Sequence, residues 1–74
     1  MHVTVKLFAS LRQFGPDRLV LELPPQTTID DVVRTVGIPV SIRLLRIVNG
    51  EHRTADEPLK DGDELALFPP IAGG

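Results

Sequence analysis

The stretch LVLELPPQTTIDDVVRTVG, residues 19–37, contains a change of hydrophobic period from about two residues to about 3.6 residues. Residues 19–23 alternate apolar side chains along one face, which is typical of a half-buried β-strand. Pro24 and Pro25 end this strand, because proline has no backbone N–H to donate. The stretch therefore predicts a strand that is followed directly by a helix.

The helical half of this stretch has start and stop signals at both ends. Thr27 or Thr28 can act as the N-cap, and Asp30 and Asp31 follow in the first turn, where the helix dipole favours anions. Gly37 supplies the C-terminal stop. Between these signals the apolar residues form one helical stripe, which must be held by packing on a sheet: Ile29, Val32, Val33 and Val36.

Three further strands are predicted on either side of this unit. Residues 2–7 alternate apolar and polar side chains, and residues 44–48 form an apolar run that Asn49-Gly50, a tight-turn dipeptide, closes. Residues 51–53 can return as a short strand, and residues 64–68 form the last one. Residues 9–17 are expected to form the loop between the first two strands, which pair antiparallel.

The order of elements is therefore β-β-α-β-(β)-β, which indicates an α+β fold with a small mixed sheet packed on one short helix. The first and last strands are the most apolar, so we expect them to pair in the middle of the sheet. This arrangement is the β-grasp, or ubiquitin-like, architecture. We expect a single domain over residues 1–68 and an extended tail over residues 69–74.

Composition excludes several functional classes. Among 74 residues there is no Cys, so disulfides, thiolate zinc sites and thiol catalysis are absent. The net charge of −2 and the three Phe, without Trp or Tyr, give no case for binding nucleic acid or an anionic membrane. The amino-terminal residues alternate in polarity, unlike a signal peptide, so we expect a cytoplasmic protein without a membrane segment.

Side chains that could perform catalysis are scarce. His2 and His52 lack the spacing of metal ligands and are expected to be exposed, and the first helical turn accounts for Asp30 and Asp31. No metal site and no catalytic side chain are therefore expected. Five acidic residues near the last turn form either a solvated turn region or a docking surface for a basic partner: Asp56, Glu57, Asp61, Asp63 and Glu64.

The carboxyl-terminal residues favour a function that needs no catalytic side chain. Phe68 leads into Pro69-Pro70, which forces a stiff, extended exit, and Ile71 and Ala72 follow. Gly73 and Gly74 have no side chains and end in the α-carboxylate. The tail from Pro69 to Gly74 can extend on the order of 20 Å, which suits insertion of this carboxylate into a narrow channel of another protein. Such a carboxylate becomes reactive once adenylated, and it can then accept sulfur or an amine.

The same segments resemble the MoaD/ThiS family of ubiquitin-like sulfur carriers over essentially the whole chain. The ending is similar to that of the small subunit of molybdopterin synthase rather than the thiamine-pathway carrier. The residues that carry the resemblance are Leu7-Phe8-Ala9 with Leu11-Arg12, Val48-Asn49-Gly50, Leu59-Lys60-Asp61-Gly62-Asp63-Glu64-Leu65, and Phe68-Pro69-Pro70-Ile71-Ala72-Gly73-Gly74.

The resemblance implies a carrier that is not itself an enzyme and binds no cofactor. An E1-like adenylyltransferase would activate Gly74 with ATP, and a sulfur donor would convert it to a thiocarboxylate. The tail would then enter the large subunit of molybdopterin synthase, with Gly73 threading the channel and Phe68, Pro69, Pro70, Ile71 and Ala72 contacting the partner. The connection over residues 38–43 is shorter than in the family, which leaves the identity of the partner open.

Three alternatives remain open from the sequence. The carrier can serve thiamine thiazole, tungsten-cofactor or cysteine synthesis, or the chain can be a ubiquitin-like modifier joined to lysines through Gly74. It can also be an interaction domain with an inactive tail. A second binding face is expected on the third and last strands, with Phe68, Ile47 and Leu44 as its candidate residues.

Overall fold

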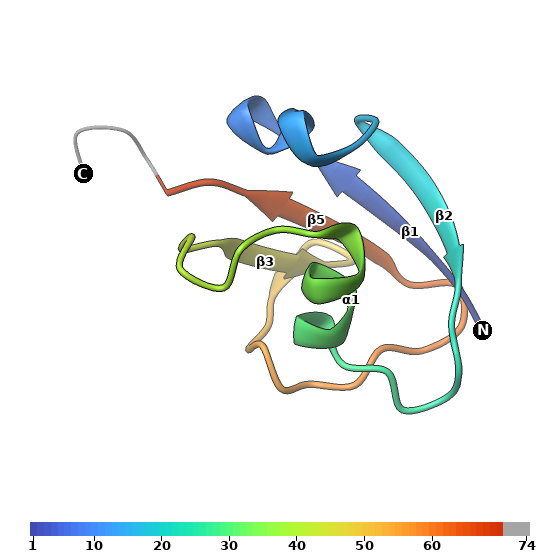
Figure 1. Ribbon diagram of the computed structural model, residues 1–74. Helices are drawn as coiled ribbons and strands as arrows, with labels where there is room; N and C mark the ends of the chain where they lie inside the picture. The colour runs from blue at the N-terminus through green and yellow to red at the C-terminus, as the bar shows by residue number, and fades with distance from the viewer. Residues whose placement is uncertain (71–74) are drawn as a thin grey trace.

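The computed structural model describes residues 1–70 and contains one mixed sheet, one α-helix and one 3₁₀ helix (Figure 1). No helix within this range is long and apolar enough to cross a membrane. The elements, in chain order, are β1 His2–Leu7, η1 Ala9–Phe14, β2 Arg18–Glu22, α1 Ile29–Val36, β3 Leu45–Val48, β4 Glu51–His52 and β5 Glu64–Phe68.

The sheet has the strand order β2-β1-β5-β3-β4, with β1 and β5 parallel at its centre. This confirms that the first and last strands pair in the middle. The other pairings are antiparallel. The strand β5 is paired on both sides: Leu65 lies opposite Val5 of β1 on one side and opposite Val48 of β3 on the other. Because β5 is enclosed in this way, its direction and its end point are fixed by two neighbours.

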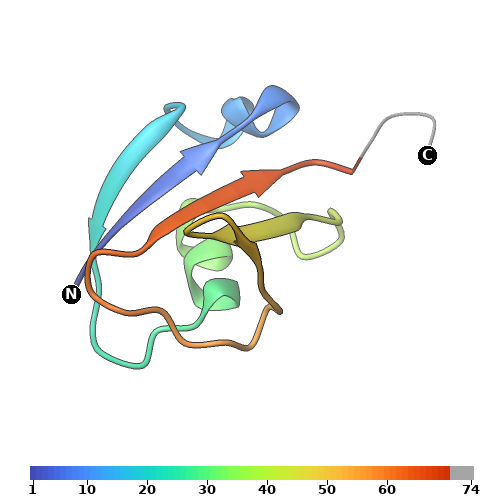
Figure 2. The same cartoon turned by 180° about the vertical axis from the view of Figure 1, so that it is seen from behind.

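The core lies between one face of the sheet and α1. Figure 1 shows α1 in front of the sheet, and Figure 2, from behind, shows β1 and β5 in front of the helix. We call the uncovered side of the sheet the open face. The buried apolar residues come from both layers and from the loops between them: Val3, Val5, Leu7, Leu11, Leu23, Ile29, Val32, Val33, Ile38, Val48, Leu59, Leu65 and Leu67.

The ends of α1 follow the predicted signals, and Thr28 is the N-cap. Its hydroxyl accepts a hydrogen bond from the Asp31 N–H at 3.1 Å, and its own N–H donates to the Asp31 carboxylate at 3.0 Å, which completes a capping box. Gly37 ends the helix with a φ of 96°, a left-handed conformation that favours glycine. Thr27 instead donates its hydroxyl to the Pro24 carbonyl and is buried.

Replacing Thr28 by Ala is expected to lower the free energy of unfolding by about 1 kcal/mol, because one helical N–H loses its partner. Hydrogen bonds from the backbone N–H and the hydroxyl of Thr28, and then the nearby Arg34 guanidinium, lower the pKa of the Asp31 carboxyl below its usual range. This contribution is present at neutral pH and lost as pH falls through the lowered pKa. Urea denaturation of the original chain and of Thr28→Ala, at pH 7 and below about pH 4, measures the loss of the cap and its pH dependence. Equal urea midpoints for the original chain and Thr28→Ala at pH 7 would contradict the capping role.

The hairpin between β3 and β4 explains two of the sequence motifs. Asn49 and Gly50 have φ values of 51° and 85°, as a tight two-residue turn requires. The Asn49 side chain also accepts from the Glu64 N–H and donates to Asp63, both at 2.9 Å. Asp63 in turn accepts from the Lys60 N–H at 2.8 Å. These residues therefore join the two turns at the start of β5.

Three other acidic residues of this region, Asp56, Glu57 and Asp61, also accept hydrogen bonds. Glu57 accepts from the Thr54 N–H, Asp56 from the Thr54 hydroxyl, and Asp61 from the His2 N–H. Glu64, the fifth acidic residue, instead forms an ion pair with Lys6, so every carboxylate of the cluster has a partner within the chain and the structure favours the interpretation as a solvated turn region. A separate docking role for a basic partner is not needed to explain the cluster.

One element was not predicted, and some boundaries differ. Residues 9–14 form a 3₁₀ helix rather than an irregular loop, and it places Leu11 in the core. A 3₁₀ helix of six residues is too short to leave a hydrophobic period that the sequence would reveal. The second strand spans Arg18–Glu22 instead of residues 19–23, and the third begins at Leu45 instead of Leu44. The final strand has the predicted bounds.

Candidate functional site

The candidate site begins where β5 leaves the sheet. Phe68 is the last paired residue, opposite Leu45, which is the first residue of β3. On the other flank the Phe8 N–H donates to the Leu67 carbonyl at 3.2 Å. Pro69 and Pro70 have no backbone N–H to donate to either neighbouring strand, so β5 ends at Phe68. The last described residues therefore leave from the centre of the sheet, at the end opposite the N-terminus (Figure 1).

Two aromatic rings mark this exit. Phe8 follows β1, and its ring stacks on that of Phe68 with a centroid separation of 4.2 Å and an interplanar angle of 11°. Both residues are half-buried, so each ring keeps part of its surface accessible. Such a stacked pair fixes the direction of the side chains beside the exit.

The stacked pair belongs to a larger apolar surface on the open face. Leu65 and Leu67 face α1, so the alternating residues of β5 face the other way. The registers of β3 and β5 place Leu45 beside Phe68 and Ile47 beside Ala66. We call this surface, which lies next to the exit, the exit patch: Phe8, Leu45, Ile47, Ala66 and Phe68.

Polar groups border the exit patch on two sides. Lys6 lies beside Ala66 and forms an ion pair of 3.3 Å with Glu64, while His52 lies beside Ile47. An apolar centre with a polar border is the usual composition of a protein–protein contact. The open face therefore has the character of a docking surface, and Pro69 and Pro70 leave the sheet beside it.

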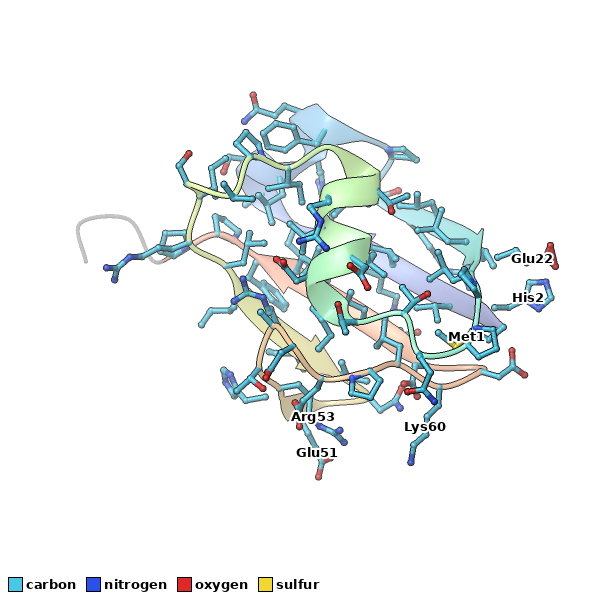
Figure 3. All side chains as sticks on the ribbon, turned by 60° about the horizontal axis from the view of Figure 1, so that its bottom comes forward. Met1, His2, Glu22, Glu51, Arg53 and Lys60 are labelled. Carbon is cyan, nitrogen blue, oxygen red and sulfur yellow. The ribbon has the colours of Figure 1, made fainter. Side chains whose placement is uncertain are left out.

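The described residues offer little else for chemistry. His2 lies at the far end, where its Nε2 is 3.4 Å from Glu22, and Figure 3 shows the two side chains together. His52 is exposed on β4. Asp30 and Asp31 both pair with Arg34. Within residues 1–70 no group of three His, Asp or Glu could hold a metal, and no pocket is enclosed.

The predicted binding residues lie in different parts of the structure. Phe68 and Ile47, two candidates for the binding face, lie on the open face, and Pro69 and Pro70 follow at the exit. Leu44, the third candidate for the binding face, instead precedes β3 and packs against the core. The predicted residues Ile71, Ala72, Gly73 and Gly74 lie outside the described residues.

Three residues of the exit patch were not predicted from the sequence: Phe8, Leu45 and Ala66. Leu45 has 38% of its surface exposed and takes the place that Leu44 was expected to fill. The strand is apolar on both faces, so periodicity alone could not set its register. Phe8 was noticed only as part of the family motif, since its contact with Phe68 spans the whole chain.

Comparison with known families and structures gives a match over nearly the whole chain. The model of the ThiS family matches residues 5–74. Over 32 residues the chain is 53% identical to the molybdopterin synthase sulfur carrier subunit of Escherichia coli K12. That alignment covers 43% of this chain and 40% of the relative, so it spans less than half the length of either protein.

Two solved structures have the same fold over almost their full lengths. One is a putative molybdopterin converting factor, subunit 1, from Pyrococcus furiosus: 32% identity, TM-score 0.77, covering 95% of this chain and 98% of that one. The other is the small archaeal modifier protein 1 of Haloferax volcanii: 29% identity, TM-score 0.73, with the same coverages of 95% and 98%. The ubiquitin-like β-grasp prediction is confirmed.

Proposed function

Because this chain belongs to the ThiS family, we propose that it is a sulfur carrier of the molybdopterin synthase type, with its reactive group at the carboxylate of Gly74. The observation that carries the proposal is that the family match extends through Gly74 and so includes the whole tail segment. The predicted membership of the MoaD/ThiS family is thereby confirmed. The similarity to the E. coli sulfur carrier subunit supports the molybdopterin pathway as the first to test.

The proposed chemistry takes place at the chain end and is catalysed by partners. On an E1-like enzyme the Gly74 carboxylate attacks the α-phosphate of ATP, and pyrophosphate leaves. A donor that supplies sulfur at the oxidation level of sulfide then displaces AMP. The net change replaces one carboxylate oxygen by sulfur, which gives a thiocarboxylate. Since an ionised carboxylate is a poor electrophile, the adenylate is needed to provide the leaving group.

The exit patch provides the proposed docking surface for the large subunit of the synthase and for the activating enzyme. Its apolar residues lie beside the point where Pro69 leaves the sheet, so a partner that covers them is positioned to receive the tail. The same patch can serve two partners in turn, because the tail must leave one active site before it enters the next. No cofactor needs to bind to this chain, and the proposal places it in the cytoplasm with ATP.

Intact mass spectrometry of the protein purified from its own host tests this function. A sulfur carrier is expected to show a species whose mass matches replacement of one oxygen by sulfur, and this species should accumulate with the activating enzyme, ATP and a sulfur donor. The sulfur of a thiocarboxylate is nucleophilic, so iodoacetamide should alkylate the sulfur-containing species and leave the unsulfurated chain, which contains no Cys, at its original mass. Failure to form it with all partners present would contradict the carrier function.

A protein modifier is the second candidate, and the likeness to the small archaeal modifier protein 1 of H. volcanii favours it. Its chemistry is the same up to the adenylate, but an amine then displaces AMP and forms an isopeptide. Conjugates of higher mass that contain Gly74 linked to lysine would support the modifier. The sulfur-containing species without such conjugates would support the carrier.

A further inference from the structure

The outer edge of β2 is the longest unpaired strand edge among the described residues. β2 forms one edge of the sheet (Figure 1) and has five residues, whereas β4, which forms the other edge, has two. Val20 lies in the middle of β2 and is 56% exposed. An edge of this kind presents backbone donors and acceptors that another strand can pair with.

The hydrogen bonds between β1 and β2 show which backbone groups point outward. Met1 and Leu23 exchange both of their hydrogen bonds, each at 2.7 Å, and the Leu7 N–H donates to the Asp17 carbonyl at 2.9 Å. Antiparallel ladders alternate, so the odd-numbered residues of β2 face β1. The N–H and C=O groups of Arg18, Val20 and Glu22 therefore face away from the sheet.

From this pattern we propose that β2 is a self-association edge, which pairs antiparallel with β2 of a second copy around a two-fold axis at Val20. Val20 then lies opposite Val20 of the second copy, and Arg18 lies opposite its Glu22. All outward groups of the three residues are satisfied, because each of these opposed pairs exchanges two hydrogen bonds. Such an interface uses the same surface on both copies, as two-fold symmetry requires.

The side chains of the edge are complementary in the same register. Arg18, Val20 and Glu22 all lie on the open face, since their partners on β1 are Lys6, Thr4 and His2. In the described chain Arg18 lies next to Lys6, a like charge, and forms no ion pair. A second copy brings Glu22 to this position, where opposite charges across the strands stabilise the pairing.

Two prolines oppose any other register. Pro16 and Pro24 occupy the next outward positions before and after the edge. A shift by two residues brings one of them into the pairing, where it lacks the N–H that the ladder needs. A parallel arrangement would place Arg18 against a like charge. The charges and the prolines thus favour only the antiparallel register in which Val20 lies opposite Val20 of the second copy.

The dimer leaves the proposed sulfur-carrier site accessible, although the inference does not depend on that function. The two-fold axis is perpendicular to the sheet, so both α1 helices lie on one side and both exit patches on the other. The exit patch is formed by β3, β5 and Phe8, which follows β1, and it lies away from the β2 edge. The two β5 strands run in opposite directions, so the two exits point away from each other.

Sedimentation equilibrium of the full chain tests the association. Strand-edge contacts are small, and small interfaces are weak, so we expect a dimer that forms at roughly 0.1 mM and above. Arg18→Glu or Glu22→Arg, each alone, should weaken it about tenfold, because like charges then face each other twice. An equimolar mixture of the two variants, and the double variant Arg18→Glu/Glu22→Arg, should regain it. Lys60→Glu is the control, because it changes the net charge as Arg18→Glu does, on an exposed turn.

Hydrogen exchange identifies the edge itself. With rising protein concentration the amides of Arg18, Val20 and Glu22 should gain protection, while those of Leu19 and Leu21, already bonded to β1, should not change. A chain that stays monomeric at millimolar concentration overturns the proposal. So does a mixture that associates no better than its separate variants, or concentration-dependent protection elsewhere than on the edge.

Discussion

Deletion of Gly74 is expected to lower sulfur transfer at least about a hundredfold while the fold stays unchanged. Each extended residue contributes about 3.4 Å, so the shortened tail withdraws its carboxylate by that distance from the reacting atoms. A displacement of this size exceeds the contact distance at which bond formation occurs. Sulfur transfer to the synthase partner, measured as the single-turnover rate, gives the effect.

Two controls separate tail length from other causes. Ala72→Gly keeps the length of the tail and removes only one methyl group, so its rate should fall far less than that of the shortened chain. The free energy of unfolding of the shortened chain should also be unchanged, because the ladders of β5 end at Phe68, before the deletion. If the shortened chain transfers sulfur at the normal rate, the terminal carboxylate of Gly74 is not the reactive group.

Leu67→Ala is expected to lower the free energy of unfolding by about 3 kcal/mol. Leu67 is fully buried on the central strand, where it faces α1, so truncation removes apolar contacts and leaves a cavity. A domain of this size has a total stability on the order of 5–10 kcal/mol, so the loss is a large fraction of it. Urea denaturation followed by far-UV circular dichroism measures the change.

Leu45→Ala is the matched variant on the other face of the sheet. The same side-chain atoms are removed, but Leu45 is partly exposed in the exit patch, so we expect a loss of stability of about 1 kcal/mol or less. Binding to the synthase partner should instead weaken by about tenfold, as for a central apolar contact in an interface. Equal losses of stability in the two variants would contradict the assignment of the faces.

The local structure was largely determined by short-range sequence signals. The capping box at Thr28, the left-handed stop at Gly37 and the turn at Asn49-Gly50 all use residues within four positions of one another. The alternation along residues 2–7 and 64–68 gave the bounds of β1 and β5, since a strand that is half buried must alternate. The order of these elements was enough to predict the β-grasp fold.

The binding surface needed the tertiary structure, because its residues come from two strands, β3 and β5, and from Phe8 after β1. The pairing of Leu45 with Phe68 fixed which side of β3 faces solvent, a choice that an apolar strand leaves open by one residue. The stacking of Phe8 on Phe68 joins residues at opposite ends of the chain, and no local pattern records such a contact. The sequence by itself thus determined the strands, the α-helix, their order and the end of the last strand before Pro69. Only the packed sheet decided which apolar side chains fill the core and which remain at the surface, because burial depends on neighbours brought together by folding.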